Sequence, residues 1–204
     1  MFGTSIYVNK FSSNAPTTNT FSTLCGVPFI EQCIQQHLVL TGCQYSTEAE
    51  LKVLLDIPLG FALHQLESLD CSDEQKYIVV SSSNCPEYWE DLWDMHPTIL
   101  LVGDYLEGEL FNAVIRAHKG EQYRLTPGYA SSLSSSERLL LRYIAHGWTN
   151  EQIAIERSVQ PKTISNAVSL LYEKLELSSR VDATLYYWGC SHLSVRKNVR
   201  YKRA

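Results

Sequence analysis

Apolar residues recur at helical spacing in the last third of the chain, and this pattern predicts a group of short helices. Within residues 161–175 the apolar positions follow one another at steps of four, three and four, which is one face of an amphipathic helix. These positions are Ile164, Val168, Leu171 and Leu175. They are expected to pack on apolar residues of neighbouring helices, namely Leu140, Ile144, Ile153 and Val159.

A repeated local signal marks the helix starts. Three times a hydroxyl residue precedes an acid or amide by three positions, so the hydroxyl can accept a backbone N–H and the later side chain can reach back. The pairs are Ser134 with Glu137, Thr149 with Gln152, and Ser179 with Asp182. Pro161 suits a first helical turn, and Gly147 suits a left-handed helix end. The predicted helices cover about 135–146, 150–157, 161–175 and 179–189.

Residues 76–127 alternate between strand and helix patterns instead. Strands are predicted at 77–80 and 98–102, and helices at 86–95 and 107–119. Upstream, the first three strands are predicted at 21–25, 38–42 and 52–56, with a helix over about 28–37. Strands that alternate with helices of this length predict an α/β domain with a doubly wound parallel sheet.

Composition and charge divide the chain further. With 204 residues and 45% hydrophobic content, two domains are expected. The chain has no run of about 18 apolar residues and no start resembling a secretory signal, which predicts a cytoplasmic protein without a membrane partner. Six cysteines without a CxxC pair argue against a zinc site, and no cofactor is expected. Net charge is −10 over residues 1–132, zero over 133–189 and +5 over 190–204, so a polyanion is expected to meet the C-terminal third.

The other side of the predicted helix 161–175 carries short polar side chains and one cation. They are Lys162, Ser165, Asn166 and Ser169. Short polar residues allow close approach and offer the donors and acceptors that base edges and phosphates require. A solvated helix face explains the same pattern, but the short connection from helix 150–157 presents this helix as a ridge and favours a nucleic-acid partner.

The segments LSSSERLLLRYIAHGWTNEQIA and PKTISNAVSLLYEKLELSSRVDA resemble the DNA-binding domain of transcription regulators of the LuxR/FixJ/NarL type, over residues 133 to about 189. The resemblance implies a four-helix, all-α helix-turn-helix domain that binds double-stranded DNA. It assigns phosphate contacts to Lys162 and Thr163, and base-facing positions to Ser165, Asn166 and Ser169.

The chain departs from this family in having few basic residues on the reading helix. Ser165 stands where the family commonly has a basic residue and Ala167 where it commonly has a histidine, so the neutral domain is expected to bind DNA weakly as a monomer. The basic tail, which includes Arg196 and Lys197, is a candidate for the missing phosphate contacts. A disordered solubilising tail is the alternative.

Two pairs of residues are candidates for homodimer contacts. By resemblance, Leu185 and Trp188 in the last helix help to form a dimer contact. Trp89 and Trp93 are four positions apart on one face of the predicted helix 86–95, and an exposed Trp there would anchor a partner. Core packing against the sheet is the alternative, and it is favoured for at least one of these two.

Residues 76–127 also resemble the second half of a response-regulator receiver domain, including the exit GEQYRLTP. Phosphoryl transfer to a receiver requires an aspartate, an acidic pair that holds Mg²⁺, a hydroxyl and a lysine. Asp56 is assigned to the acceptor position and Ser81 to the hydroxyl, but no acidic pair follows FSTLC, and Val102 and Gly103 stand near the lysine position. The pattern predicts a pseudo-receiver in which Asp56 is a vestigial phosphoacceptor, with a plain strand-end acid as the alternative.

Together these patterns predict five segments and one leading function. The segments are an N-terminal arm (1–19), a receiver-like domain (20–125), a linker (126–132), a helix-turn-helix domain (133–190) and a basic tail (191–204). The leading hypothesis is a dimeric, sequence-specific transcription regulator that is not an enzyme and is not regulated by aspartate phosphorylation. The alternatives are an auxiliary factor that acts through a partner regulator, a protein-interaction module that has lost DNA binding, and a working phosphoacceptor.

Overall fold

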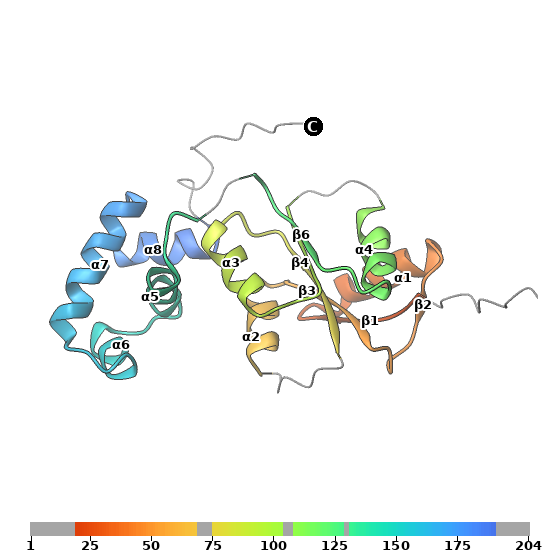
Figure 1. Ribbon diagram of the computed structural model, residues 1–204, viewed down its shortest axis with the longest axis horizontal. Coiled ribbons are helices and arrows are strands. Elements are labelled where there is room, and N and C mark those ends of the chain that lie inside the picture. The colour runs from red at the N-terminus through yellow and green to blue at the C-terminus, as the bar shows by residue number, and fades with distance from the viewer. Residues whose placement is uncertain (1–18, 69–74, 104–107, 129–130, 191–204) are drawn as a thin grey trace, which may run out of the picture.

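The chain forms a parallel α/β domain followed by a bundle of four helices (Figure 1). The computed structural model describes residues 19–68, 75–103, 108–128 and 131–190. This architecture confirms the predicted pairing of a receiver-like domain with an all-α helix-turn-helix domain. Among the described residues, no helix is both long and apolar enough to cross a bilayer.

The described residues include a six-stranded parallel sheet in the order β2-β1-β3-β4-β5-β6. Its strands are β1 (Thr20–Cys25), β2 (Gln44–Tyr45), β3 (Leu51–Leu55), β4 (Lys76–Ser81), β5 (Ile99–Val102) and β6 (Tyr123–Leu125). The helices between them are α1 (Pro28–Leu40), α2 (Phe61–Ser68), α3 (Pro86–Asp94) and α4 (Glu109–His118). Because every pairing is parallel, the carboxyl ends of β3 and β4 meet at one edge, which brings Asp56 and Ser81 together.

Both faces of the sheet are covered, which explains the nearly continuous apolar runs of its strands. Val53 and Leu55 belong to a core with α1 and α4, whereas Leu54 between them belongs to a core on the side of α2 and α3. All residues of β5 are buried for the same reason. Figure 1 shows α1 and α4 on one side of the sheet and α2 and α3 on the other.

The C-terminal helices begin where the local signals predict. Ser134 and Thr149 each form a complete capping box, and the Ser179 hydroxyl accepts the backbone N–H of Asp182. Gly147 adopts the expected left-handed conformation, with φ of 81°. The helices are α5 (Ser135–Ala145), α6 (Asn150–Glu156), α7 (Pro161–Leu175) and α8 (Arg180–Tyr187).

Parts of the predicted fold require correction. Residues 38–40 continue α1 instead of starting a strand at 38–42, because Leu38 packs into the core as part of the helix, and the next strand is the short β2. The sequence patterns also do not predict α2 or β6. Val159 is 40% exposed, so it is not part of the expected core under α7.

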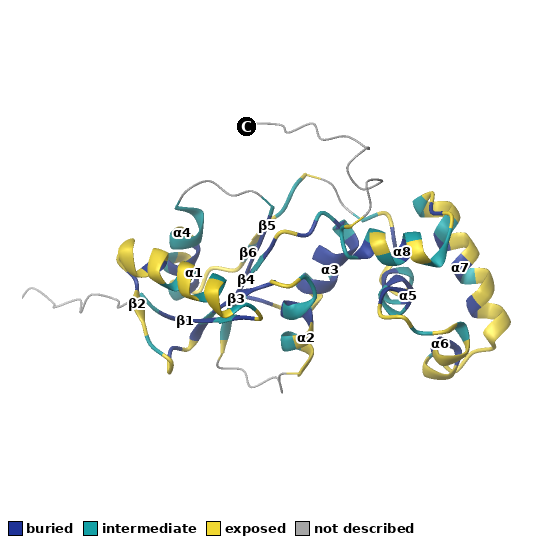
Figure 2. Cartoon of the chain, turned by 180° about the vertical axis from the view of Figure 1, so that it is seen from behind, coloured by how far each residue is buried: buried dark blue, intermediate teal, exposed yellow. Residues whose placement is uncertain are grey.

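The two domains pack on each other and share an apolar core. Residues of the α2 and α3 side of the sheet belong to the same buried cluster as residues of α5, α6, α7 and α8. In Figure 2 much of α3 and α5 is coloured as buried where the domains meet. Helix α7 lies at the end of the bundle that is distant from the sheet (Figure 1). Docking of the domains therefore leaves α7 uncovered by the receiver-like domain.

Candidate functional site

Helix α7 presents its polar face to solvent. The buried residues Ile164, Val168 and Leu171 hold the opposite face of the helix in the bundle. The residues that the sequence assigns to DNA contacts are all exposed, and they are Lys162, Thr163, Ser165, Asn166 and Ser169. The helical repeat thus separates the buried and exposed faces of α7 correctly.

The connection from α6 to α7 is short and ordered by backbone hydrogen bonds. Ser158 adopts a left-handed conformation with φ of 52°, and its N–H donates to the Ile155 carbonyl at 3.1 Å. The Gln160 carbonyl then accepts the N–H of Thr163 at 2.9 Å. Within the described residues no side chain caps the start of α7, so the positive N-terminal end of the helix stays open to an acceptor such as a phosphate oxygen.

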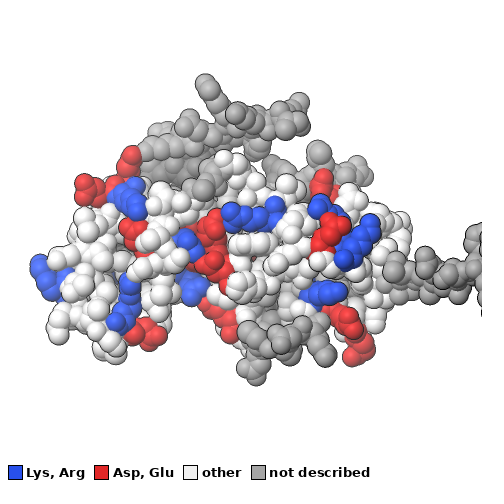
Figure 3. Space-filling model, in the orientation of Figure 1, with Lys and Arg blue, Asp and Glu red and all other residues white. Residues whose placement is uncertain are grey.

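Most of the positive charge on the bundle is engaged within the molecule. Within residues 131–190, all of which the structure describes, Lys162 is the one Lys or Arg side chain that makes neither an ion pair nor a hydrogen bond. The engaged side chains are Arg138, Arg142, Arg157, Lys174 and Arg180. In Figure 3 much of the surface over α7 carries neither Lys or Arg nor Asp or Glu. Because phosphate neutralisation contributes much of DNA affinity, one available cation implies weak binding by a single copy.

Charge along α7 determines which half of the helix suits a polyanion. Lys162 lies in the first turn, whereas the exposed residues Glu173 and Glu176 lie at the C-terminal end. Lys174 is paired with Glu137 at 3.0 Å. A capping hydrogen bond from a backbone N–H, followed by the Lys174 ammonium, lowers the pKa of Glu137 to about 2. The N-terminal half of α7, with its positive helix end, is therefore the half that suits phosphate.

In the last helix, the two candidate dimer residues differ in their surroundings. Leu185 is 41% exposed, as a contact residue requires. Trp188 is half-buried, donates its indole N–H to the Ala145 carbonyl at 3.1 Å, and has its ring 5.9 Å from that of Tyr88 in α3. In this conformation the Trp188 ring therefore packs between the two domains, and its role in a dimer contact stays a prediction.

The two tryptophans of α3 also differ. Trp89 is 2% exposed and donates its indole N–H to the Ser83 carbonyl at 2.9 Å, so it is a core residue and the expectation that it anchors a partner is corrected. Trp93 is half-buried, and the guanidinium of Arg124 lies 5.9 Å from its ring centroid. Of this pair, only Trp93 stays a candidate for a dimer contact.

Asp56 follows β3 at the predicted acceptor position, but its side chain is fully buried. One carboxylate oxygen accepts the backbone N–H groups of Gly60 at 2.9 Å and Ala62 at 3.0 Å. The other accepts the hydroxyls of Ser81 at 2.7 Å and Tyr88 at 2.9 Å. Burial raises the pKa of Asp56 above its ordinary value, and these hydrogen bonds oppose the shift. Both carboxylate oxygens are thus engaged inside the protein.

The edge of the sheet beside Asp56 does not fit a magnesium ion. Gly26 and Val27 stand where an acidic pair would follow β1. A side chain at position 26 would approach Pro58 Cδ to 2.8 Å and the Ile57 carbonyl oxygen to 2.9 Å. Magnesium is typically held by one or two carboxylates together with water, and both oxygens of the Asp56 carboxylate are already engaged in hydrogen bonds. Among the described residues, no group of three His, Cys, Asp or Glu side chains is placed to hold a metal ion.

Two sets of predicted features lie outside the described residues. Arg196 and Lys197 belong to the tail at 191–204, and nearly all of the predicted arm lies within 1–18. The contribution of the tail to DNA binding stays a prediction.

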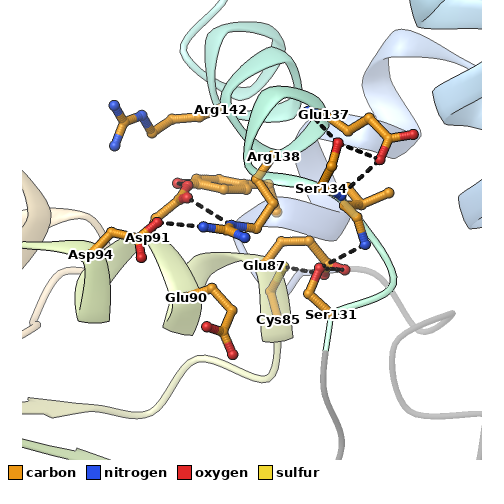
Figure 4. A network of polar contacts seen from close by, with 12 residues as sticks. Cys85, Glu87, Glu90, Asp91, Asp94, Ser131, Ser134, Glu137, Arg138 and Arg142 are labelled. Atoms are coloured by element: carbon orange, nitrogen blue, oxygen red, sulfur yellow. Dashed lines mark hydrogen bonds and ion pairs between the residues drawn. The ribbon is translucent and has the colours of Figure 1, made fainter.

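The residues that join the two domains are the ones that the sequence patterns miss. Asp91 of α3 accepts the hydroxyl of Tyr187 at 2.7 Å and faces the Arg138 guanidinium at 3.4 Å. Glu87 accepts the hydroxyl of Tyr186 at 2.7 Å. Figure 4 shows these acids of α3 together with Arg138 of α5. The bonded residues are 47 to 99 positions apart, so no local spacing signals their pairing.

Comparison with known proteins gives matches for both parts of the chain. Residues 131–187 match the family described as bacterial regulatory proteins, luxR family. The chain is 37% identical over 67 residues to the probable transcriptional regulatory protein SgaR of Hyphomicrobium methylovorum, which covers 33% of this chain and 29% of SgaR. It is 26% identical over 128 residues to the transcriptional regulatory protein DesR of Bacillus subtilis (strain 168), which covers 60% of this chain and 62% of DesR. The matches thus span less than two thirds of each relative.

Solved structures share the arrangement of most of the chain. A structure of two RcsB dimers bound to two parallel DNAs has a TM-score of 0.52 at 15% identity, covering 84% of this chain and 98% of that one. RcsB from Salmonella enterica serovar Typhimurium, bound to promoter P1flhDC in the presence of phosphomimetic BeF3-, has a TM-score of 0.54 at 16% identity, with coverage of 84% and 98%. At these identities the likeness shows the two-domain fold alone.

Proposed function

The chain carries a luxR-family domain at residues 131–187 behind a receiver-like domain, and on that premise we propose that it is a sequence-specific DNA-binding transcription regulator. The observation that carries the proposal is the exposed polar face of α7, whose opposite face is buried in the bundle. The names of the relatives SgaR and DesR, both described as transcriptional regulatory proteins, support it. No enzymatic activity is part of the proposal, and a regulator of bacterial genes would act in the cytoplasm.

In this proposal the N-terminal half of α7 enters the major groove. Lys162 and Thr163 contact phosphates at the positive N-terminal end of the helix, which no side chain caps. Ser165, Asn166 and Ser169 face the base edges, where an asparagine amide matches the donor and acceptor pair of adenine. Phosphate contacts set affinity and register, and the base contacts set sequence preference.

We infer that the regulator binds DNA as a homodimer. Because each copy has a single available cation, a dimer is expected to bind DNA more tightly than a monomer. Two copies double the phosphate contacts and read two half-sites. Leu185 and Trp93 are the candidate contact residues that the structure leaves partly accessible.

We further propose that aspartate phosphorylation does not regulate the receiver-like domain. Attack on a phosphoryl donor would require the Asp56 carboxylate to give up hydrogen bonds to two backbone N–H groups and two hydroxyls. An acidic side chain at position 26, which could hold magnesium, would clash with Pro58 and the Ile57 carbonyl. Incubation with acetyl phosphate is therefore expected to leave the protein mass unchanged, and a stoichiometric phosphoryl adduct on Asp56 would contradict this proposal.

A second candidate function is an auxiliary regulator that binds DNA only beside a partner regulator. The observation that favours it is the engagement of the other basic side chains of the bundle, which leaves Lys162 alone on the reading helix. In that case the partner supplies most of the phosphate contacts, and α7 supplies sequence preference.

Both candidates are tested by selecting bound fragments from the genomic DNA of the source organism. The purified full chain is mixed with fragments at two salt concentrations, and the enriched fragments are footprinted. A regulator is expected to protect a discrete, two-fold symmetric site and to bind more weakly as salt rises. An auxiliary regulator protects such a site only after its partner is added. Absence of any protected site in both conditions would refute both functions.

A further inference from the structure

We propose that Asp56, at the position of a receiver's phosphoacceptor, serves in this chain as an internal anchor that fixes the helical domain against the receiver-like domain. The anchor acts through Tyr88 and Gly60, which contact Asp56 on one side and the end of α8 on the other. The biological meaning of this inference rests on the proposed function, because it identifies what holds the DNA-binding domain in place. The docking itself does not depend on that function.

Asp56 fixes the two groups that form the docking surface. Its carboxylate accepts the Gly60 N–H and the Tyr88 hydroxyl, each at 2.9 Å. The Gly60 N–H also donates to the Tyr88 hydroxyl oxygen at 3.1 Å, so the three residues form a closed set of hydrogen bonds. Asp56 and Tyr88 are 0% and 1% exposed, so water cannot readily replace a lost partner. Removing the carboxylate therefore frees both Tyr88 and the turn at Gly60.

The same two groups contact the end of α8. The Tyr88 ring lies edge-on to that of Tyr187, with centroids 5.4 Å apart and planes at 90°, and its centroid is 5.9 Å from that of Trp188. Gly60 lies directly against the Trp188 indole, because a Cβ added there would be 2.8 Å from ring atom Cζ3. The position of Trp188 thus depends on both groups that Asp56 holds.

Ion pairs also join the two domains around these aromatic contacts. Arg138 pairs with Asp91 and Asp94 of α3, and Arg142 pairs with Glu67 of α2 at 3.4 Å. The side chains of Asp94 and Glu67 are 54% and 38% exposed, so their pairs are largely screened by solvent. The aromatic contacts of Tyr88 with Tyr187 and Trp188 are the part of the interface that a substitution of Asp56 changes directly.

Docking of α8 determines where the reading helix stands. Helix α5 packs on both α8 and α7, so the bundle is expected to move as one body when α8 is released. Asp56 therefore acts as a positioning residue for α7, although it does not touch that helix. In a dimer, the orientation of the two α7 helices sets the spacing of the half-sites that they read.

The test measures the distance between the domains, and DNA is not used. Spin labels are placed on the exposed Cys33 of α1 and on Glu156→Cys at the end of α6, in a full chain that carries Cys71→Ser and Cys190→Ser. The labelled parent is expected to give one narrow distance distribution. Tyr88→Phe, which removes only the hydroxyl, and Asp56→Ala are each expected to broaden it by about twofold or more.

Val53→Ala is the matched control, because it shortens a buried side chain on the same strand β3 that belongs to the core on the opposite face of the sheet. It is expected to lower stability and to keep the narrow distribution. The proposal is overturned if folded Tyr88→Phe keeps the parent width, or if Val53→Ala broadens the distribution as much. If Asp56→Ala does not fold, the width of the distance distribution of Tyr88→Phe alone tests the proposal. A chain that docks normally and binds no DNA would refute the proposed function and leave the anchor standing.

Discussion

Replacement of Arg138 by methionine tests the polar contacts between the domains most sharply. Arg138 lies in α5, and its side chain is 10% exposed. It pairs with Asp91 at 3.4 Å and also bonds to the more exposed Asp94. Methionine has a similar length and can fill the same space without a charge. The variant therefore leaves Asp91 buried at the interface, with the hydroxyl of Tyr187 as its remaining close donor and Arg142 as the remaining nearby cation.

The size of the effect follows from the burial of Asp91, which is 5% exposed. Removing one partner of a buried ion pair typically costs about 3 to 5 kcal/mol, because the other charge stays desolvated. The pair with Asp94 adds less than about 1 kcal/mol, since that carboxylate faces solvent. Burial already raises the pKa of Asp91, so uptake of a proton limits the loss. We therefore expect Arg138→Met to lower the free energy of unfolding by about 3 kcal/mol at neutral pH.

Urea denaturation of the full chain measures this loss, with Arg116→Met as the control. Arg116 pairs with Glu121 on the surface at 2.6 Å, with side chains 45% and 43% exposed, and its loss should cost far less than the loss of Arg138. Adding Asp91→Asn to Arg138→Met removes the stranded charge and should recover at least about 1 kcal/mol. Equal losses for Arg138→Met and Arg116→Met would refute the assignment of a buried interdomain ion pair.

Two further changes probe the surroundings of Asp56. Gly60→Ala and Gly42→Ala both place a side chain at a left-handed position, with φ of 93° and 103°, and each should cost about 1 to 2 kcal/mol for that reason. Only the Cβ of Gly60→Ala would meet the Trp188 ring, at 2.8 Å. In thermal unfolding Gly60→Ala should therefore be more destabilising than Gly42→Ala by at least about 1 kcal/mol, and equal losses would contradict the close packing. Because burial raises the folded-state pKa of Asp56 above 3.8, the folded chain binds this proton at higher pH than the unfolded chain does. We therefore compare the free energy of unfolding of the native protein with that of Asp56→Asn. The difference should rise in favour of the native protein as pH falls from the raised pKa toward 3.8, and it should stay constant at pH values above the raised pKa. A difference that does not change with pH would contradict the shift.

The helical domain is predictable from sequence because its determinants are local. Ser134 and Thr149 find their partners three residues away, and both capping boxes form as the spacing indicates. The face of α7 follows from a single helical repeat, so the exposed position of Asn166 is predicted without knowledge of the neighbours. The same local logic fails at 38–42, where an apolar run that suits a strand instead completes α1.

The interface between the domains is not predictable in this way. Tyr88 bonds to Asp56 across 32 positions, and Asp91 bonds to Tyr187 across 96. The spacing of residues within one helix carries no information about such partners. Trp188 shows the consequence, because resemblance places it in a dimer contact, whereas the fold packs it between the domains. Acids on α3 indicate a polar contact in general, but only the assembled fold identifies Arg138 as the partner.

The most direct test of α7 as the reading helix is the binding of two single variants to a selected site and to unrelated DNA, each at two salt concentrations. Lys162→Ala is expected to weaken binding to both DNAs and to reduce the salt slope by about 1, because a phosphate contact is lost. Asn166→Ala is expected to weaken binding to the selected site by about 1 to 3 kcal/mol and to leave binding to unrelated DNA nearly unchanged. If the intact protein binds its site and neither variant alters that binding, α7 is not the element that reads DNA.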